Sequence, residues 1–274
     1  MPLKNILVHV DNSAQAAGTI AAACGLARAH NAHLTGLTVE RPPQVPGYAA
    51  IELPTSALDV IKAQQAESIA QARAIFEKTV EKTGLSSQSG WSLAKGFTLE
   101  TLALRSRYAD LTVIAQENAA TSTTDPGLVD DLVMTSGRPV LVIPYIGAPP
   151  NIGRSILIAW NASRESARAV ADAMPLMERA ESVEVLAVEP EGLGDTPGAD
   201  IAAHLARHGI KVRANSTRGL DIDVGDVILN RVADSGADLV VMGAYGHSRM
   251  RELVLGGATR HILAHMTVPV LLSH

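Results

Sequence analysis

Hydrophobic residues fall along the chain in two alternating patterns. Short, largely apolar runs occur at residues 6–8, 111–114 and 239–242. Such runs are typical of strands buried on both faces of a parallel sheet. Between them lie longer segments in which apolar residues recur at helical spacing, as in residues 56–82. This alternation predicts an α/β fold with a parallel sheet and right-handed crossovers.

The same pattern divides the first half of the chain into elements. Asn12 or Ser13 is the expected N-cap of the first helix, because both follow the first strand and carry side chains that can accept hydrogen bonds from helix-start N–H groups. Helices are expected up to about residue 30 and over residues 56–82, 99–107 and 126–135, and strands over residues 6–8, 33–39, 88–93, 111–114 and 139–143.

The amino-acid sequence of the second half of the chain repeats that of the first half. A segment rich in Gly and Pro at residues 147–150 fits a linker between the two copies. We therefore predict two domains of one fold, at residues 1–147 and 152–274. Three stretches carry the repeat: residues 4–8 match 154–158, residues 109–113 match 237–241, and residues 138–141 match 268–271.

A set of glycines follows the apolar run at residues 239–242. Gly243 and Gly246 bracket a sharp loop, and Gly256 and Gly257 stand where the next helix is expected to begin. Helix starts expose unpaired backbone N–H groups and the positive end of the helix dipole, and glycine lets an anion approach the backbone closely. The arrangement predicts a site for a nucleotide phosphate. Alternatively, the glycines merely allow a tight strand-to-helix turn.

The spacing Gly243-x2-Gly246-x9-Gly256 resembles the nucleotide-binding signature of the universal stress protein family. Gly257 departs from that signature, in which Ser or Thr follows the last glycine. The resemblance implies two tandem doubly wound five-stranded parallel sheets, each in the order 3-2-1-4-5. It also implies that the domains pair through their last strands as an intramolecular pseudo-dimer, and whether two chains then form a homodimer stays open.

The resemblance further implies ATP as the ligand of the second domain. In a doubly wound sheet, ligands bind beyond the carboxyl ends of the strands where the strand order reverses. Asn161 stands where the family often has Asp, so it lacks the charge that would help to hold Mg²⁺. Trp160 could stack on a base or fill the pocket. The expected binding residues are Ala159, Trp160, Asn161, Val188, Met242, Gly243, Gly246, His247, Gly256, Gly257, Ala258 and Thr259.

The first copy lacks the glycine motif. Glu117 stands soon after its fourth strand and would place negative charge where a phosphate belongs, and no glycine follows until Gly127. We therefore expect no ATP binding by this route in the first domain.

Composition narrows the choice of compartment and partner. A formal net charge of −5, without any Lys/Arg run, argues against binding to nucleic acid. No apolar stretch approaches the roughly 18 residues that span a bilayer. Cys24 is the only cysteine, so a disulfide within the chain is impossible and the expected role is a small buried thiol. We predict a cytoplasmic protein with no membrane partner.

Motifs for catalysis are missing from the sequence. It contains neither a Gly-x4-Gly-Lys-Ser/Thr loop nor a Gly-x-Ser-x-Gly elbow, and no nucleophile–base set converges on the glycine loop. The pairs His204/His208 and His261/His265 lack the Glu of a zinc-binding His-Glu-x2-His motif. The leading hypothesis is a regulatory nucleotide-binding stress protein, at most a slow ATPase. The alternatives are an interaction module whose pocket is closed by Trp160, and an enzyme of the wider adenine-nucleotide hydrolase-like group.

Overall fold

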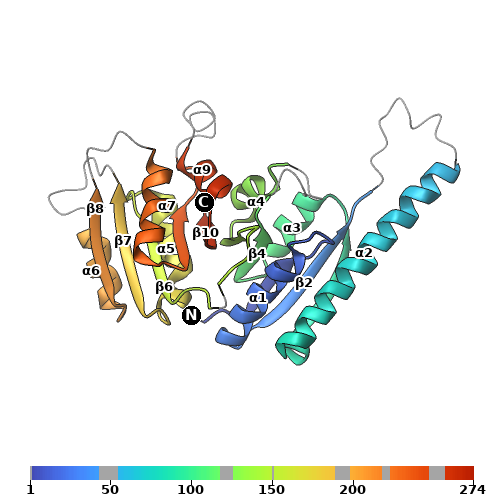
Figure 1. Ribbon diagram of the computed structural model, residues 1–274, viewed down its shortest axis with the longest axis horizontal. Coiled ribbons are helices and arrows are strands. Elements are labelled where there is room, and N and C mark those ends of the chain that lie inside the picture. Colours follow the sequence, from blue (N-terminus) through green and yellow to red (C-terminus); the bar gives the residue numbers. More distant parts are fainter. Residues whose placement is uncertain are drawn as a thin grey trace.

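The two halves of the chain share one sheet (Figure 1). The computed structural model describes residues 2–42, 55–117, 126–149, 151–188, 198–217, 223–246 and 257–274. Its strands are β1 (Asn5–His9), β2 (His33–Glu40), β3 (Ser89–Lys95), β4 (Leu111–Ala115), β5 (Val140–Ile143), β6 (Ser155–Ala159), β7 (Ser182–Val188), β8 (Val212–Thr217), β9 (Leu239–Gly243) and β10 (Val270–Ser273).

The strand order is β3-β2-β1-β4-β5-β10-β9-β6-β7-β8. Each half therefore has the predicted order 3-2-1-4-5, with all strands inside a half parallel. At the centre, β10 pairs with β5 in the antiparallel direction, with Leu271 opposite Leu141. The predicted fold class is confirmed, and the two five-stranded sheets are continuous with each other.

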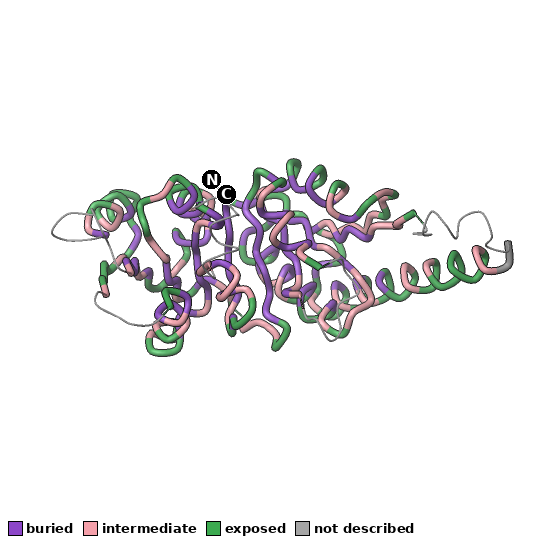
Figure 2. Tube along the Cα trace, turned by 90° about the horizontal axis from the view of Figure 1, so that it is seen from above, coloured by how far each residue is buried: buried purple, intermediate pink, exposed green. Residues whose placement is uncertain are grey.

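Helices cover both faces of the sheet and bury two separate cores (Figure 2). One core lies under α1 (Ala16–His30), α2 (Thr55–Thr83), α5 (Arg164–Met177) and α6 (Ala199–Arg207). The other lies under α3 (Thr98–Ser106), α4 (Leu128–Ser136), α7 (Val224–Ser235) and α9 (Ala258–His265), and a single 3-10 turn, η1, spans Ser86–Gln88. Among the described residues, no helix is both long and apolar enough to cross a membrane.

Cys24 on α1 is 1% exposed, as expected for a buried thiol. Burial is the main cause that raises the pKa of this thiol, against smaller opposing effects of Thr83 and Arg28. A raised pKa leaves little thiolate at neutral pH, so the group fits a packing role.

The predicted N-cap of α1 is wrong. The cap residue is Gln15, which makes no side-chain cap bond. Asp11 instead accepts hydrogen bonds from the backbone N and the hydroxyl of Ser13, at 3.1 and 2.6 Å. The local turn uses Ser13 as a donor before the helix begins, which removes it from the capping position.

Two aspartates at equivalent places in the repeat make the same contact. Asp110, before β4, accepts hydrogen bonds from the backbone N of Lys4 and Asn5 at 2.7 and 2.9 Å. Asp238, before β9, accepts from Gly153 at 2.7 Å and from Arg154 at 3.0 Å. In each half the carboxylate therefore ties the amino end of the fourth strand to the start of the first.

Candidate functional site

The carboxyl ends of β6, β7 and β9 bring several predicted site residues together. Ala159, the last residue of β6, pairs in register with Met242 of β9. Trp160 follows directly, and its backbone N donates to the Leu186 carbonyl on β7 at 2.9 Å. Val188 ends β7. These residues lie where the strand order reverses, as the fold predicts for a ligand site.

Trp160 and Asn161 differ in what they can offer a ligand. Trp160 is half-buried and packs against the core under α5. Asn161 is exposed, and its Oδ1 accepts from the backbone N of Ser163 at 3.1 Å, which closes a turn before α5. The Asn161 amide is thus oriented by its own loop, with its Nδ2 left as the group that can donate.

Gly243 and Gly246 make room for the first turn of α5. A Cβ at Gly243 would lie 2.5 Å from the backbone carbon of Glu165 and also against the backbone N of Ser166. A Cβ at Gly246 would lie 3.0 Å from Oε2 of Glu165. The glycines therefore have a packing role that the sequence did not reveal. Because they lack a Cβ, the first turn of α5 can pack closely against the end of β9.

Glu165 places a buried negative charge beside this loop. Its side chain is 7% exposed. The pKa of Glu165 is held below its usual value, chiefly by a bond from its own backbone N–H, while burial opposes the shift and Arg164 at 3.2 Å assists it. Sequence reasoning missed Glu165; the one available signal was an acidic residue in the first turn of a helix whose N-cap is Ser163.

The start of α9 carries no side-chain cap from the part of the chain that the structure describes. Its N-cap is Gly257, with extended backbone at φ −57° and ψ 144°. Ala258 and Thr259 form the first turn, and Thr259 is buried. The first turn holds no acidic residue. His247 and Gly256, also expected at the site, lie outside the described residues.

The equivalent helix start in the first half, that of α4, is capped by a carboxylate of the protein itself. Glu117 accepts hydrogen bonds through both carboxylate oxygens, from Gly127 N at 2.9 Å and from Val129 N at 3.0 Å, and these are the first amides of α4. The space between these residues and the end of β1 is only about 20 Å³. An internal carboxylate thus takes the position that an anion would need, as expected from the sequence.

In the second half, Tyr245 takes the position of Glu117 in the aligned repeat. Its hydroxyl donates to the carboxylate of Asp130 on α4. Asp130 also lies 3.9 Å from the Arg260 guanidinium on α9. The residue that could have blocked the start of α9 therefore points away to the other half of the chain.

Glu117→Ala is expected to lower the free energy of unfolding by about 1–2 kcal/mol, because two amides of α4 lose a charged acceptor. Urea denaturation at pH 7 measures this. Glu100→Ala in the first turn of α3 is the matched control, since Glu100 has the same helix-dipole advantage without a cap bond. Equal losses in both variants would mean that the Glu117 bonds add nothing.

The first half contains a cavity that sequence reasoning did not find. It measures about 440 Å³ and lies between the carboxyl ends of β1 and β2 and one face of α2. Polar walls come from His9, Asp11 and Arg41, with apolar ones from Val39 and Ile69. Because Glu117 already accepts hydrogen bonds from the amides of α4, those amides are closed to a phosphate in this cavity.

The paired histidines form helix-surface contacts. His261 on α9 lies 2.8 Å from an oxygen of Asp226 on α7, and its ring centroid is 4.5 Å from that of His265. His204 and His208 have ring centroids 4.9 Å apart. No cluster of three or more potential metal ligands occurs among the described residues. The His261–Asp226 pair joins α9 to α7.

Known proteins resemble this chain in sequence and in fold. Residues 153–274 match the sequence model of the universal stress protein family. A curated relative, a universal stress protein from Synechocystis sp., is 44% identical over 46 residues, which cover 17% of this chain and 16% of that protein.

Solved structures extend the likeness to the whole chain. A universal stress protein from Archaeoglobus fulgidus DSM 4304 has a TM-score of 0.74 at 14% identity, over 98% of this chain and 97% of that one. A universal stress protein solved in complex with cAMP covers 52% of this chain and 98% of its own, at 18% identity and a TM-score of 0.38. The Archaeoglobus likeness shows that the fold is shared over both halves.

Proposed function

The C-terminal half of this chain belongs to the universal stress protein family, and we propose that it binds an adenine nucleotide, ATP first among them, as a regulatory ligand in a stress response. The observation that carries the proposal is the difference between the two helix starts. Glu117 caps α4, whereas the start of α9 has no side-chain cap from the described residues. An uncapped helix start with a glycine N-cap suits a phosphate.

The proposed contacts follow from this geometry. Backbone N–H groups at Gly257, Ala258 and Thr259 would hold phosphate oxygens, and the amide of Asn161 would donate to the ribose or the base. Trp160 would lie beside the base. The chemistry of these groups is binding chemistry, because neutral amides and one indole supply neither a nucleophile nor a base.

A regulatory role is supported by contacts that join α9 to the first half. Gln116 is buried at the end of β4, and its Nε2 donates to the Leu263 carbonyl on α9 at 2.7 Å. The Tyr245–Asp130–Arg260 chain reaches the same helix. Together with the β5–β10 pairing, these bonds support an intramolecular pseudo-dimer. In it, a nucleotide bound at the start of α9 would alter the contact between the two halves.

Gly257→Asp is expected to abolish the ATP-dependent rise in melting temperature while raising the stability of the ligand-free protein by roughly 0.5 kcal/mol. The backbone angles at Gly257 are open to any residue, so an Asp there can cap α9 as Glu117 caps α4. The same carboxylate repels phosphate. Gly257→Ser adds a hydroxyl without charge and should strengthen ATP binding. Thermal shift and calorimetric titration with ATP measure both effects.

The control is Phe97→Asp at the start of α3. Phe97 is also an N-cap without a side-chain bond, has similar backbone angles (φ −76°, ψ 142°), and is 56% exposed. This variant should gain stability by the same capping effect and keep its response to ATP. If the wild-type protein shows no response to ATP, the pocket is closed, and the interaction-module alternative replaces nucleotide binding.

A further inference from the structure

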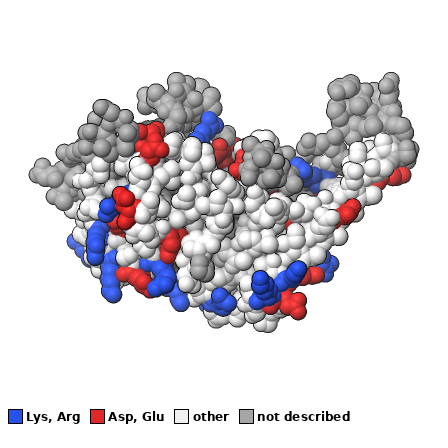
Figure 3. Space-filling model, viewed as in Figure 1, with Lys and Arg blue, Asp and Glu red and all other residues white. Residues whose placement is uncertain are grey.

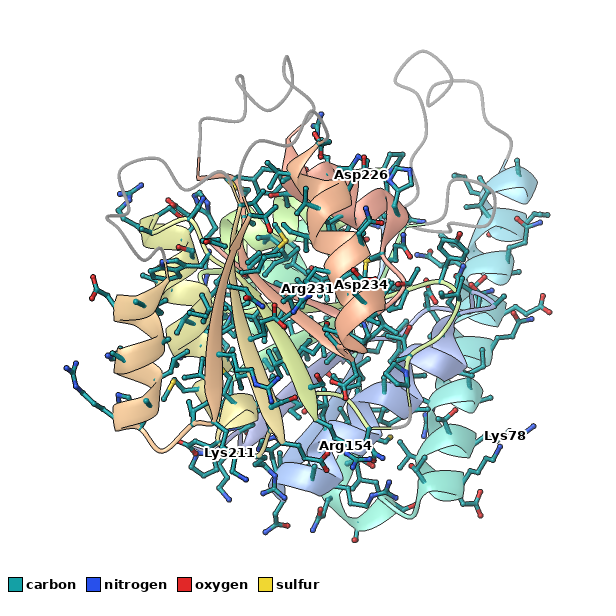
Figure 4. All side chains as sticks on the ribbon, turned by 60° about the vertical axis from the view of Figure 1, so that its left-hand side comes forward. Lys78, Arg154, Lys211, Asp226, Arg231 and Asp234 are labelled. Carbon is teal, nitrogen blue, oxygen red and sulfur yellow. The ribbon has the colours of Figure 1, made fainter. Side chains whose placement is uncertain are left out.

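A cavity of about 360 Å³ lies between the two halves, at the amino ends of the strands. Arg28 and His30, from the last turn of α1, form one wall. Arg154, just before β6, and Arg179, just after α5, form the other. Arg154 stands at the lower end of the sheet in Figure 4. The cavity therefore lies at the amino ends of the strands. The nucleotide is proposed to bind at the other side of the sheet, at the carboxyl ends of β6 and β9.

The walls of this cavity carry positive charge only. Of the described residues that line it, three are arginines and none is acidic. Glu181 pairs with Arg154 at 2.9 Å from outside the lining, and Glu178 lies near His30. Lys and Arg also gather along the lower edge of the face in Figure 3, with carboxylates among them. Arg28 donates through Nη1 to the Thr83 carbonyl at 3.4 Å, which leaves its charge uncompensated. One arginine is therefore partly neutralised, and the cavity keeps an excess of positive charge.

His30 is the group that most needs a partner, because it is buried, whereas the three arginines are exposed at the surface of the cavity. His30 is 7% exposed, and its imidazole has no hydrogen bond to any residue that the structure describes. The Arg179 guanidinium is exposed to solvent and has no ion pair or hydrogen bond within the described ranges, so it is available to a ligand. Burial lowers the pKa of His30, Arg179 lowers it further, and Glu178 opposes the shift. A buried polar group without a partner costs about 1–3 kcal/mol, and for the His30 imidazole a suitable ligand would recover this cost.

We propose that this cavity binds a small polyanion that carries phosphate groups, held by Arg28, Arg154 and Arg179 with His30 as a further donor. Guanidinium groups bind phosphate through two parallel N–H bonds. A phosphate monoester carries about −1.5 to −2 charges at pH 7, which matches the excess of arginine. Apolar walls from Ile152 and Leu176 leave room for an organic group beside the phosphate. Such a ligand would contact both halves at once.

The test uses the Gly257→Asp chain, in which the proposed nucleotide site is blocked. Calorimetric titrations at constant ionic strength would use tripolyphosphate, inorganic phosphate and ribose 5-phosphate. We expect saturable binding, and we expect Arg179→Gln to weaken it about tenfold or more, which corresponds to ~1.4 kcal/mol. Arg207→Gln on exposed α6 is the matched control and should leave the affinity unchanged.

Two results would overturn the proposal. One is no binding of any of the three probes at millimolar concentration. The other is an equal loss in Arg179→Gln and Arg207→Gln, which would mean that phosphate binds the basic surface without a site. Tighter binding of ribose 5-phosphate than of tripolyphosphate would identify a phosphorylated metabolite, and the reverse would identify a free polyphosphate; both support the site.

A second measurement follows His30 directly. Its imidazole resonance can be assigned by its loss in His30→Asn, and its pKa can be titrated by NMR with and without tripolyphosphate. A bound anion should raise the pKa of His30, because the anion opposes the effect of Arg179 and adds to that of Glu178. An unchanged pKa at saturation would place the anion elsewhere. Failure of this site would leave the nucleotide proposal standing, since Gly257→Asp tests that separately.

Discussion

Gly243→Ala is expected to lower the free energy of unfolding by about 3 kcal/mol, at the upper end of the usual cost of overpacking. The added methyl group would meet the backbone of Glu165 and Ser166 rather than a movable side chain end. Relief requires a shift of α5 away from β9, which exposes part of the core that lies under this helix. The same shift would displace Trp160 and Asn161, so ATP binding should be lost as well.

Gly90→Ala is the control for this change. Gly90 also lies in a strand, β3, but the nearest atom to an added Cβ is His33 Nε2 at 3.7 Å. This substitution should therefore be neutral or stabilise the protein by about 0.4–1 kcal/mol through the unfolded state. Urea denaturation of both variants gives the comparison. If Gly243→Ala behaves like Gly90→Ala, α5 does not approach β9 as closely as the structure has it.

The strands were predictable from the sequence because most of them are buried on both faces. Burial of this kind produces apolar runs such as those of β1, β4 and β9, whose central residues are all buried. β8 left no such signal: it is the last strand at one edge of the sheet, its sequence is VRANST, and its central residues are exposed. The family resemblance implied the strand order, and the repeat extended that order to both halves.

The candidate site was less predictable because its key contacts join distant parts of the chain. The spacing of Gly243 and Gly246 suggested room for a phosphate, but both glycines also admit the first turn of α5, some 80 positions earlier. The charge at Glu117 was visible in the sequence. Its two hydrogen bonds to the start of α4 were not, because they depend on how the chain folds back between these residues. The cavities at β1–β2 and at the end of α1 have no motif, since their walls come from separate elements.

The joint between β5 and β10 holds the two halves as one sheet, and Leu141 and Leu271 lie directly opposite each other in it. Both are at most 1% exposed and belong to the same core. Each Leu→Ala change should cost about 3 kcal/mol, from lost burial and the cavity left behind. Leu104→Ala on α3, where the side chain is 50% exposed, should cost less than about 0.5 kcal/mol.

A double-mutant cycle separates the joint from the two halves. If β5 and β10 stabilise each other, Leu141→Ala and Leu271→Ala should be non-additive by about 0.5 kcal/mol or more, because the two side chains share one contact and one cavity. Unfolding in urea should stay a single transition in each variant, since either change weakens the sheet that both halves share. Additive losses, or a transition that splits so that Leu271→Ala shifts only one step, would show that the halves fold independently. In that case α9 could not transmit nucleotide binding through the joint, and the Gln116–Leu263 and Tyr245–Asp130 bonds would be the remaining route.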